Sequence, residues 1–396
     1  MVVIPWDFGA DSTAYRAFMR DNMLPATTVE FLFVLMAMAR GFSPFAAVRL
    51  LPKTTQIGLS MLVIGSLWTT IVVAVYPAMA VIGLIKLFTH LMFGLAFAHQ
   101  MATWNHAQRD QIWVAIGIGV IGFCMLWGAN IVFYHPVGND WARLVPTLTN
   151  VRWAGLYALA IFCAGVGMIR KCVDGETDQC SFALAILFGA IGIAISIWTG
   201  TRAAAGAIFI ATIVSAFILP VWRQLLVIAV CSAIIGSTVG ASLPVVHPYY
   251  GMIRMAGAMA PALNGDVSSG RVYIWIDMFG KITHRPLIGW GFDQFRYSFP
   301  EGTTRIRHPH NGLMQLIYSS GFMGLIAAAM IAFSFVRSIT KKITERYQYA
   351  SVVFVAGACA YGLFDGFFYF TYPVMILLVA VCCLVVPTQP LPVTDR

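Results

Sequence analysis

Long apolar runs dominate this sequence and constrain its fold more than any other feature. About eleven runs are long enough to cross the hydrocarbon of a membrane, which takes roughly 20 apolar residues in a helix. They lie near residues 24–39, 57–77, 79–100, 111–134, 151–170, 181–199, 202–219, 222–242, 311–336, 348–364 and 370–386. Because the runs are continuous and do not alternate with period two, they predict helices and not the strands of an outer-membrane barrel.

The composition excludes the other broad classes of protein. Only 10% of the 396 residues are charged and 59% are hydrophobic, whereas a soluble globular protein carries about 25% charged residues. Disorder is excluded because 28 Phe, 14 Tyr and 11 Trp cannot all stay solvated. We therefore expect an all-α, polytopic helical membrane protein with about eleven transmembrane helices. The first 23 residues lack a basic segment followed by an apolar one, so we expect no cleavable signal peptide.

The basic residues of the short loops predict the topology. Loops on one side, from Arg40 to Arg396, hold twelve basic residues, and those on the other side hold four. The positive-inside rule places the larger set in the cytoplasm and the long segment 243–310 on the outer side. We expect three parts: a transmembrane bundle of about eight spans over residues 1–242, an outward loop over 243–310, and C-terminal spans with a short cytoplasmic tail over 311–396.

The outward loop is positively charged and contains an amphipathic pattern. It holds seven Arg and Lys residues against four Asp and Glu, a net charge of +3. Trp275, Met278, Phe279 and Ile282 follow Arg271 at i, i+3, i+4 and i+7, which predicts a short helix on the membrane surface. An ordinary solvated loop would explain the charges. An anionic ligand would explain them too, because the guanidinium fork binds phosphate oxygens.

Three more polar residues need an explanation because charges at membrane depth are costly. Arg202 begins a span among small residues (TGTRAAAG), His310 opens the span after the loop, and Asp365 lies in the outward hairpin of the last two spans. A snorkelling arginine, a structural histidine and an ion-pair partner would account for them. The functional reading is an anion-binding arginine, a histidine that moves a proton near neutral pH, and a carboxylate base.

Motifs for other chemistries are missing from the sequence. It contains no HExxH, Walker, DxD or GxSxG pattern, and the spacing of Cys172 and Cys180 is not that of a zinc site. We therefore expect no metal and no cofactor, and nothing indicates a nucleic-acid partner.

Three motifs in order resemble the O-antigen ligase family. His310-Asn311 is followed after nine residues by Gly321-Phe-Met-Gly324, which is similar to the family signature of a histidine, a small polar residue, a nine-residue gap and GxxG. The stretch RPLIGWGFDQF resembles the loop motif of Pro, Leu, a small residue and GWG. TGTRAAAG resembles the family's arginine at the start of a span. The resemblance covers roughly residues 195–330.

This resemblance implies a GT-C-like glycosyltransferase of the bacterial inner membrane, either an O-antigen ligase or a related polysaccharide polymerase. Such enzymes move a glycan from undecaprenyl diphosphate to an acceptor hydroxyl on the periplasmic side, with neither a nucleotide sugar nor a metal. The acceptor would be lipid A–core for a ligase and a second lipid-linked glycan for a polymerase. The alternative is a secondary transporter or a flippase for lipid-linked glycan, although transporters usually show internal repeats and midplane charges.

The resemblance also assigns roles to individual residues. It implies that Arg202 and Arg271 bind the diphosphate and that His310 belongs to the active site. The chemistry is consistent with this, since fixed cations stabilise the negative charge that builds on a diphosphate leaving group. His310 is the expected base for the acceptor hydroxyl, although it could instead donate to the phosphate. The complete expected site is His310, Asp365 and Asp277 for catalysis and Arg202, Arg271, Arg285 and Arg307 for the diphosphate.

Overall fold

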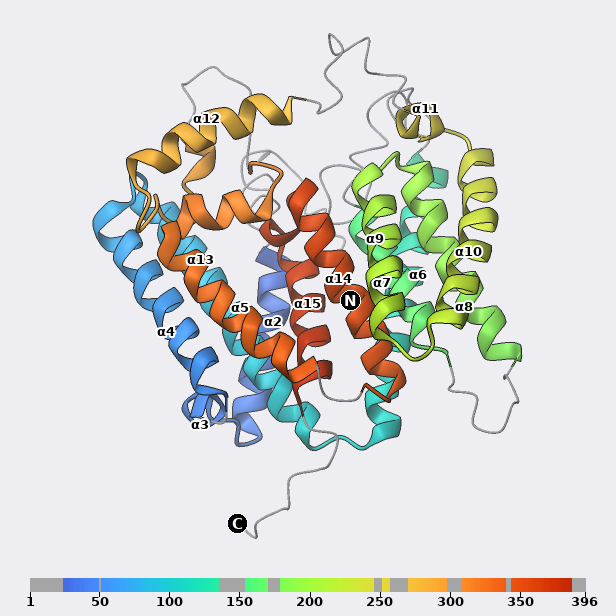
Figure 1. Cartoon of the computed structure of the whole chain (residues 1–396), viewed down its shortest axis with the longest axis horizontal. Coiled ribbons are helices and arrows are strands. Elements are labelled where there is room, and N and C mark those ends of the chain that lie inside the picture. Colours follow the sequence, from blue (N-terminus) through green and yellow to red (C-terminus); the bar gives the residue numbers. More distant parts are fainter. Residues whose placement is uncertain are drawn as a thin grey trace. The chain divides into compact units, whose positions relative to one another are not determined.

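A computed structural model describes residues 24–49, 51–134, 154–169, 179–245, 251–256, 270–297, 308–339 and 343–386. Every regular element in these ranges is a helix, which confirms the all-α prediction (Figure 1). The helices divide into two compact units, and each unit is assembled from separate stretches of the chain. The expected division into residues 1–242, 243–310 and 311–396 stays a prediction.

Each of the eleven expected apolar runs coincides with an apolar helix. Among the described residues, seven helices have the length and composition to cross a membrane. Four others are apolar but shorter, at 10–17 residues: Ala26–Ala39, Gly155–Val166, Arg202–Ile218 and Thr371–Val385. The chain is thus a polytopic helical membrane protein, and the number of eleven spans stays a prediction.

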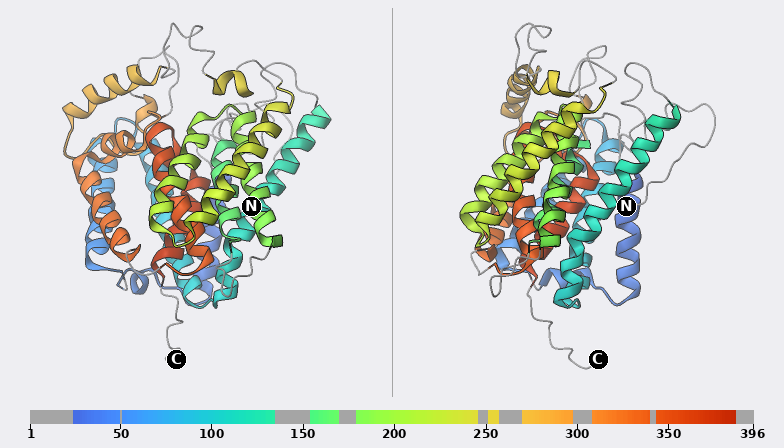
Figure 2. Two further views of the ribbon diagram at one scale, coloured as in Figure 1. Left: turned by 45° about the vertical axis from the view of Figure 1, so that its right-hand side comes forward. Right: turned by 90° about the vertical axis from the view of Figure 1, so that its right-hand side faces the viewer.

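The first unit packs its helices through small residues. On α10, Gly236 and Gly240 lie one turn apart, and a Cβ on either would lie 2.5 or 2.8 Å from the carbonyl oxygens of Ala190 and Ala194 on α8. Such close approach is how membrane helices associate, and α8 and α10 run side by side (Figure 2). The helices of this unit are α6 (His106–Tyr134), α7 (Gly155–Val166), α8 (Gln179–Trp198), α9 (Arg202–Ile218), α10 (Trp222–Ser242), α11 (Gly251–Met255) and most of α14 (Arg346–Phe364).

The second unit holds most of the candidate site. Within it, α4 packs along α13, and α5 packs along both α2 and α15. Its helices are α2 (Leu24–Ala39), α3 (Pro44–Arg49), α4 (Lys53–Trp68), α5 (Pro77–Ala102), α12 (Arg271–His284), α13 (Gly312–Ile339) and α15 (Thr371–Val385). It also contains a π-helical turn, η1 (Thr69–Val73), and two 3₁₀ turns, η5 (Phe295–Tyr297) and η6 (Phe367–Tyr369).

Two buried pairs of polar side chains join α5 to other segments of the second unit. The carboxylate of Glu30 on α2 is fully buried and lies 2.7 Å from Nδ1 of His90. One turn away, Nζ of Lys86 lies 2.7 Å from Asp293, just after the GWG motif. A buried carboxylate is stable only with a partner, so both pairs fix neighbouring segments to α5.

The amphipathic helix of the loop is confirmed as α12, but its buried face differs from the expected one. Met278 and Ile282 pack in a small core with Phe295 and Tyr318. Phe279, expected on that face, is 64% exposed. The reason is that α12 is apolar on two faces and packs against α13, so that positions 278 and 282 meet Tyr318 while position 279 stays exposed. The exposed face also carries Val272, Tyr273 and Ile276.

Candidate active site

Two of the sequence motifs are joined backbone to backbone in the second unit. The PLIGWG segment, residues 286–291, runs beside α13 at the point where the GxxG motif begins. Four backbone hydrogen bonds of 2.8–3.2 Å connect them: Trp290 to Tyr318, Gly291 to Ser319, Phe322 to Pro286 and Met323 to Leu287.

The glycines of the two motifs make this contact possible. Gly321 interrupts α13 with φ 62° and ψ −163°, and a Cβ there would overlap the backbone of Leu287. Gly289 has φ +71°, and its Cβ would lie 2.6 Å from the carbonyl oxygen of Tyr318. Only glycine adopts such a backbone readily and leaves room for another chain segment. The GWG motif precedes the histidine in the sequence and the GxxG motif follows it, and the two motifs form one structural unit.

The His310-Asn311 pair forms the start of α13. The Oδ1 atom of Asn311 accepts the backbone N–H of Met314 at 3.0 Å, which is the usual N-cap bond of a helix. Its Nδ2 donates to the carbonyl of Leu363 at 3.1 Å. His310, just before the cap, has φ 55°, a left-handed conformation that is uncommon for a residue with a side chain. The turn directs the imidazole toward the loop after α14.

The imidazole of His310 meets the carboxylate of Asp365. Nδ1 of His310 lies 2.7 Å from Oδ1 of Asp365, and the same oxygen accepts the backbone N–H of Gly366 at 2.8 Å. Burial by itself raises the pKa of Asp365, but the hydrogen bond and charge of His310, with the charge of Arg271, lower that pKa below its ordinary value. Asp365 is therefore an ionised carboxylate that orients the histidine, and the side chain of His310 is 32% exposed.

Two residues of α12 connect this helix to the histidine and the aspartate. The guanidinium of Arg271, the first residue of α12, lies 3.7 Å from Oδ2 of Asp365. One turn later, Nε1 of Trp275 donates to the carbonyl of Pro309 at 2.8 Å. The structure therefore brings together three of the expected site residues, Arg271, His310 and Asp365.

The same cluster has the donor set of a metal site but a poor electrostatic environment for one. Ligand atoms of His308, His310 and Asp365 lie within 4.8 Å of one another. However, Nδ1 of His308 already accepts the backbone N–H of His310, and the cation Arg271 lies beside Asp365. A divalent cation would be repelled by Arg271, and at Nδ1 of His308 it would displace the backbone contact. The arrangement suits proton transfer better than metal binding, and the expectation of no metal stays a prediction.

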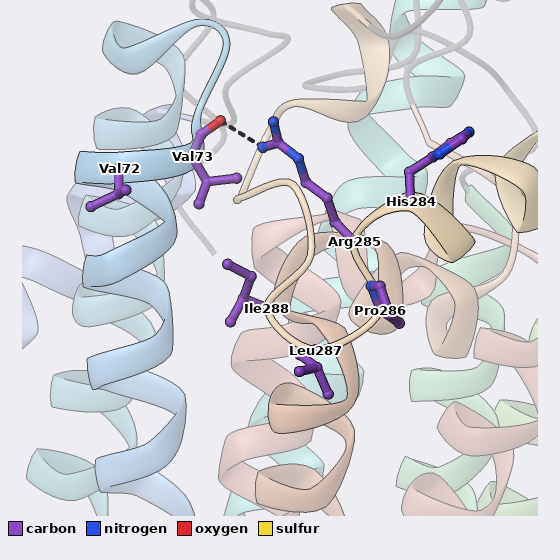
Figure 3. Close-up of a pocket in the computed structure, with 7 residues that line it drawn as sticks. All are labelled: Val72, Val73, His284, Arg285, Pro286, Leu287 and Ile288. Atoms are coloured by element: carbon purple, nitrogen blue, oxygen red, sulfur yellow. Dashed lines mark hydrogen bonds between the residues drawn. The ribbon is translucent and has the colours of Figure 1, made fainter.

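Arg285 lies at an apolar cavity and is held by two contacts. Its Nη1 donates to the carbonyl of Val73 at 3.1 Å, and its guanidinium lies over the ring of Trp290 at 4.2 Å. Figure 3 shows the side chain reaching the end of η1 while His284 points away from it. The cavity has a volume of about 410 Å³ and is lined by Val72, Val73, His284, Arg285, Pro286, Leu287 and Ile288.

The other expected residues are Asp277, Arg202 and Arg307. Asp277 is on an exposed part of α12, where its carboxylate pairs with Lys281 at 2.6 Å. Arg202 is the exposed first residue of α9 and belongs to the first unit. Arg307 lies outside the described residues.

Sequence reasoning missed two residues that the structure connects with the expected ones. Arg254 of α11 packs its aliphatic stem on Gly200, two residues before Arg202, because a Cβ on Gly200 would lie 2.7 Å from Cδ of Arg254. His308 lies against His310. A signal for His308 was present, since a second histidine stands two residues before the signature histidine, whereas Arg254 was one of seven loop cations with nothing to distinguish it.

Comparison with known proteins agrees with these motifs. Residues 184–329 match the sequence model of a family described as O-antigen ligase. A 92-residue stretch is 26% identical to a protein of Rickettsia felis (strain ATCC VR-1525 / URRWXCal2) named "Putative polysaccharide ligase", which corresponds to 20% of this chain and 23% of that protein. The chain thus spans about a quarter of the length of this curated relative. Through residues 184–329, this chain is similar to the O-antigen ligase family.

Proposed function

We propose that the protein is a membrane glycosyltransferase that moves a glycan from a polyprenyl diphosphate, as in undecaprenyl diphosphate, to an acceptor hydroxyl at the outer face of the bacterial inner membrane. The observation that carries the proposal is the contact between His310 and the ionised Asp365, next to Arg271, at the signature motif. The match of residues 184–329 to the O-antigen ligase family model supports a glycan ligase or polymerase.

The geometry supports His310 as the base for the acceptor. If Nδ1 of His310 donates to Asp365, then Nε2 is the nitrogen that can take a proton. The acceptor oxygen would attack the anomeric carbon, its proton would pass to Nε2, and the bond from that carbon to the phosphate oxygen would break. The nearby carboxylate stabilises the imidazolium that forms, as in other histidine–carboxylate pairs.

Cations would stabilise the departing diphosphate. Arg271 lies beside Asp365, and because its side chain is 24% exposed it can also bind a phosphate oxygen. Arg202 is exposed at the N-terminus of α9, where the helix dipole also favours an anion. Arg285 is held by Val73 and Trp290, and we assign it to the apolar cavity, which could take part of the polyprenyl chain. Arg307 stays a candidate by its charge.

The acceptor separates a ligase from a polymerase. The name of the Rickettsia felis relative favours a ligase, for which the acceptor would be lipid A–core, and a polymerase would use a second lipid-linked glycan. A transporter or flippase for lipid-linked glycan is the alternative of a different class. The histidine–carboxylate pair favours an enzyme, because transport requires no base at the sugar.

The test is a transfer assay with purified protein in liposomes. It contains undecaprenyl-diphosphate-linked glycan, EDTA and no nucleotide, with lipid A–core or excess lipid-linked repeat as the acceptor. A glycan–lipid A product would establish a ligase, and a ladder on the polyprenyl carrier a polymerase. His310→Ala should abolish either product, whereas His106→Ala, at an exposed histidine that also pairs with a carboxylate, should retain it. If the wild type and His310→Ala are equally silent with both acceptors, the enzyme proposal is wrong and transport is tested next.

A further inference from the structure

His308 is a buried histidine that the proposed chemistry does not use. It is 4% exposed, its ring centroid lies 4.2 Å from that of His310, and its ring meets Phe370 edge to face. Nδ1 of His308 accepts the backbone N–H of His310 at 3.3 Å. Because an accepting ring nitrogen carries no proton, this bond assigns His308 the neutral form with its proton on Nε2.

The hydrogen bond to His308 holds His310, the residue of the site with the least favourable backbone conformation. His310 has φ 55°, a conformation that persists only where the surroundings hold it. Two side chains bind the backbone of this stretch directly, Trp275 at the carbonyl of Pro309 and His308 at the N–H of His310. A return to negative φ would redirect the side chain and separate Nδ1 of His310 from Asp365.

The loop that carries Asp365 also accommodates His308. Gly366 packs against this ring so closely that a Cβ would overlap the imidazole atoms. Its N–H donates to Oδ1 of Asp365, the oxygen that His310 contacts. Gly366 therefore links the position of Asp365 to the position of the His308 ring.

We propose that His308 is a positioning residue of the transfer site. Its Nδ1 holds the backbone of His310 so that the imidazole stays on Asp365 and presents Nε2 to the acceptor hydroxyl. His308 itself touches no substrate. This inference rests on the proposed role of His310 as a base.

Matched variants test the position of the accepting atom. His308→Asn keeps an acceptor at the δ position, and His308→Gln moves it one bond away. We expect kcat of His308→Asn within about threefold of the wild type, and kcat of His308→Gln about tenfold lower with an unchanged KM for the lipid-linked donor, as for one lost hydrogen bond. Equal loss in both variants would overturn the proposal.

A second test displaces the His308 ring without replacing His308. Gly366→Ala should reproduce the kinetics of His308→Gln, because its methyl group would push the imidazole out of place. Gly280→Ala is the control, since a Cβ there meets nothing within 4 Å. If Gly366→Ala retains wild-type kcat, the ring does not need its position and the proposal is wrong.

A double-mutant cycle tests whether His308 acts through the His310–Asp365 contact. If it does, His308→Gln combined with Asp365→Ala should be no slower than Asp365→Ala alone, because Asp365→Ala already removes the contact that His308 holds in place. Multiplying losses would show that His308 acts independently and would overturn the proposal.

A chemical measurement decides the geometry without relying on transfer. The rate at which diethyl pyrocarbonate modifies His310, followed by mass spectrometry, reports the state of its imidazole. In His308→Gln this rate should move to that of Asp365→Ala, which lacks the contact, and in His308→Asn it should match the wild type. An unchanged rate in His308→Gln would refute the positioning role. If no variant transfers glycan but the rates shift as expected, the proposed function fails while the geometry holds.

Discussion

Replacing Asp365 by Asn tests how the histidine is oriented. In the variant, His310 loses an ionised acceptor at 2.7 Å. A hydrogen bond to a charged group contributes about 1.5–3 kcal/mol, which corresponds to a rate loss of roughly 10- to 150-fold if it acts fully in the transition state. In catalytic triads the same exchange lowers kcat by about 10⁴, because the amide group imposes the wrong histidine tautomer.

The structure decides between these two magnitudes. The backbone N–H of Gly366 donates to Oδ1, the oxygen that His310 also contacts. An Asn side chain keeps this bond only if its oxygen occupies the Oδ1 position, since its NH₂ group would face a second donor there. The histidine then keeps its tautomer and loses only the charge. We therefore expect the smaller loss, of roughly 10- to 150-fold.

The assay is the single-turnover rate of transfer in liposomes at saturating donor. Glu345→Gln is a matched control, because Glu345 also pairs with a histidine, His106, but at 3.5 Å and more exposed to solvent. We expect this control to stay within about twofold of the wild type. A loss below about threefold in Asp365→Asn would refute the orienting role, and a loss near 10⁴ would show that Gly366 does not fix the amide.

Three further predictions follow from the same contacts. Arg271→Lys should retain the charge beside Asp365 but raise the KM for the lipid-linked donor by about tenfold, measured in the same transfer assay, because lysine lacks the bidentate fork. Gly321→Ala should destabilise the fold by about 1–2 kcal/mol or more in thermal denaturation, whereas Gly206→Ala, where a Cβ meets nothing within 4 Å, should not. Because the pKa of Asp365 is lowered in the folded state, its ionised form stabilises the fold above the ordinary pKa of about 3.9 and this stability is lost below it. The melting-temperature difference between wild type and Asp365→Asn should therefore not shrink between about pH 8 and 5 but should shrink below about pH 4; a difference that already shrinks near pH 6 would contradict the lowered pKa.

Apolar runs predicted the helices well because membrane helices must satisfy their own backbone hydrogen bonds over a set length. All eleven runs became helices, and the amphipathic segment became α12. The division of the chain into two units was not predictable, since each unit combines separate stretches of sequence. Hydropathy gives the position of a helix and not its neighbours, and in lipid the neighbours are chosen by packing of small residues such as Gly236.

The buried face of α12 shows where helical periodicity fails. The i, i+3, i+4, i+7 pattern groups Trp275, Met278, Phe279 and Ile282, but a second apolar set with Tyr273 and Ile276 lies beside it. With apolar residues on two faces, only the partner decides which is buried. The partner is Tyr318 of α13, which reaches α12 because the GWG segment holds the two elements together.

The sequence allows one part of the pairing of His310 with Asp365 to be predicted, the shared side of the membrane, but not the contact itself. Two consecutive spans return the chain to the side from which it started, so a residue before the first and a residue after the second share one side of the membrane. That argument places both side chains at one face and gives no distance. Contact at 2.7 Å requires the left-handed backbone of His310, and nothing in the spacing of residues predicts that conformation. Asn311 is the nearest sequence clue, because an N-cap residue fixes where the helix begins and therefore where the residue before it must turn. The signature motif thus turns the imidazole of His310 toward the carboxylate of Asp365, which is 55 residues away in the sequence.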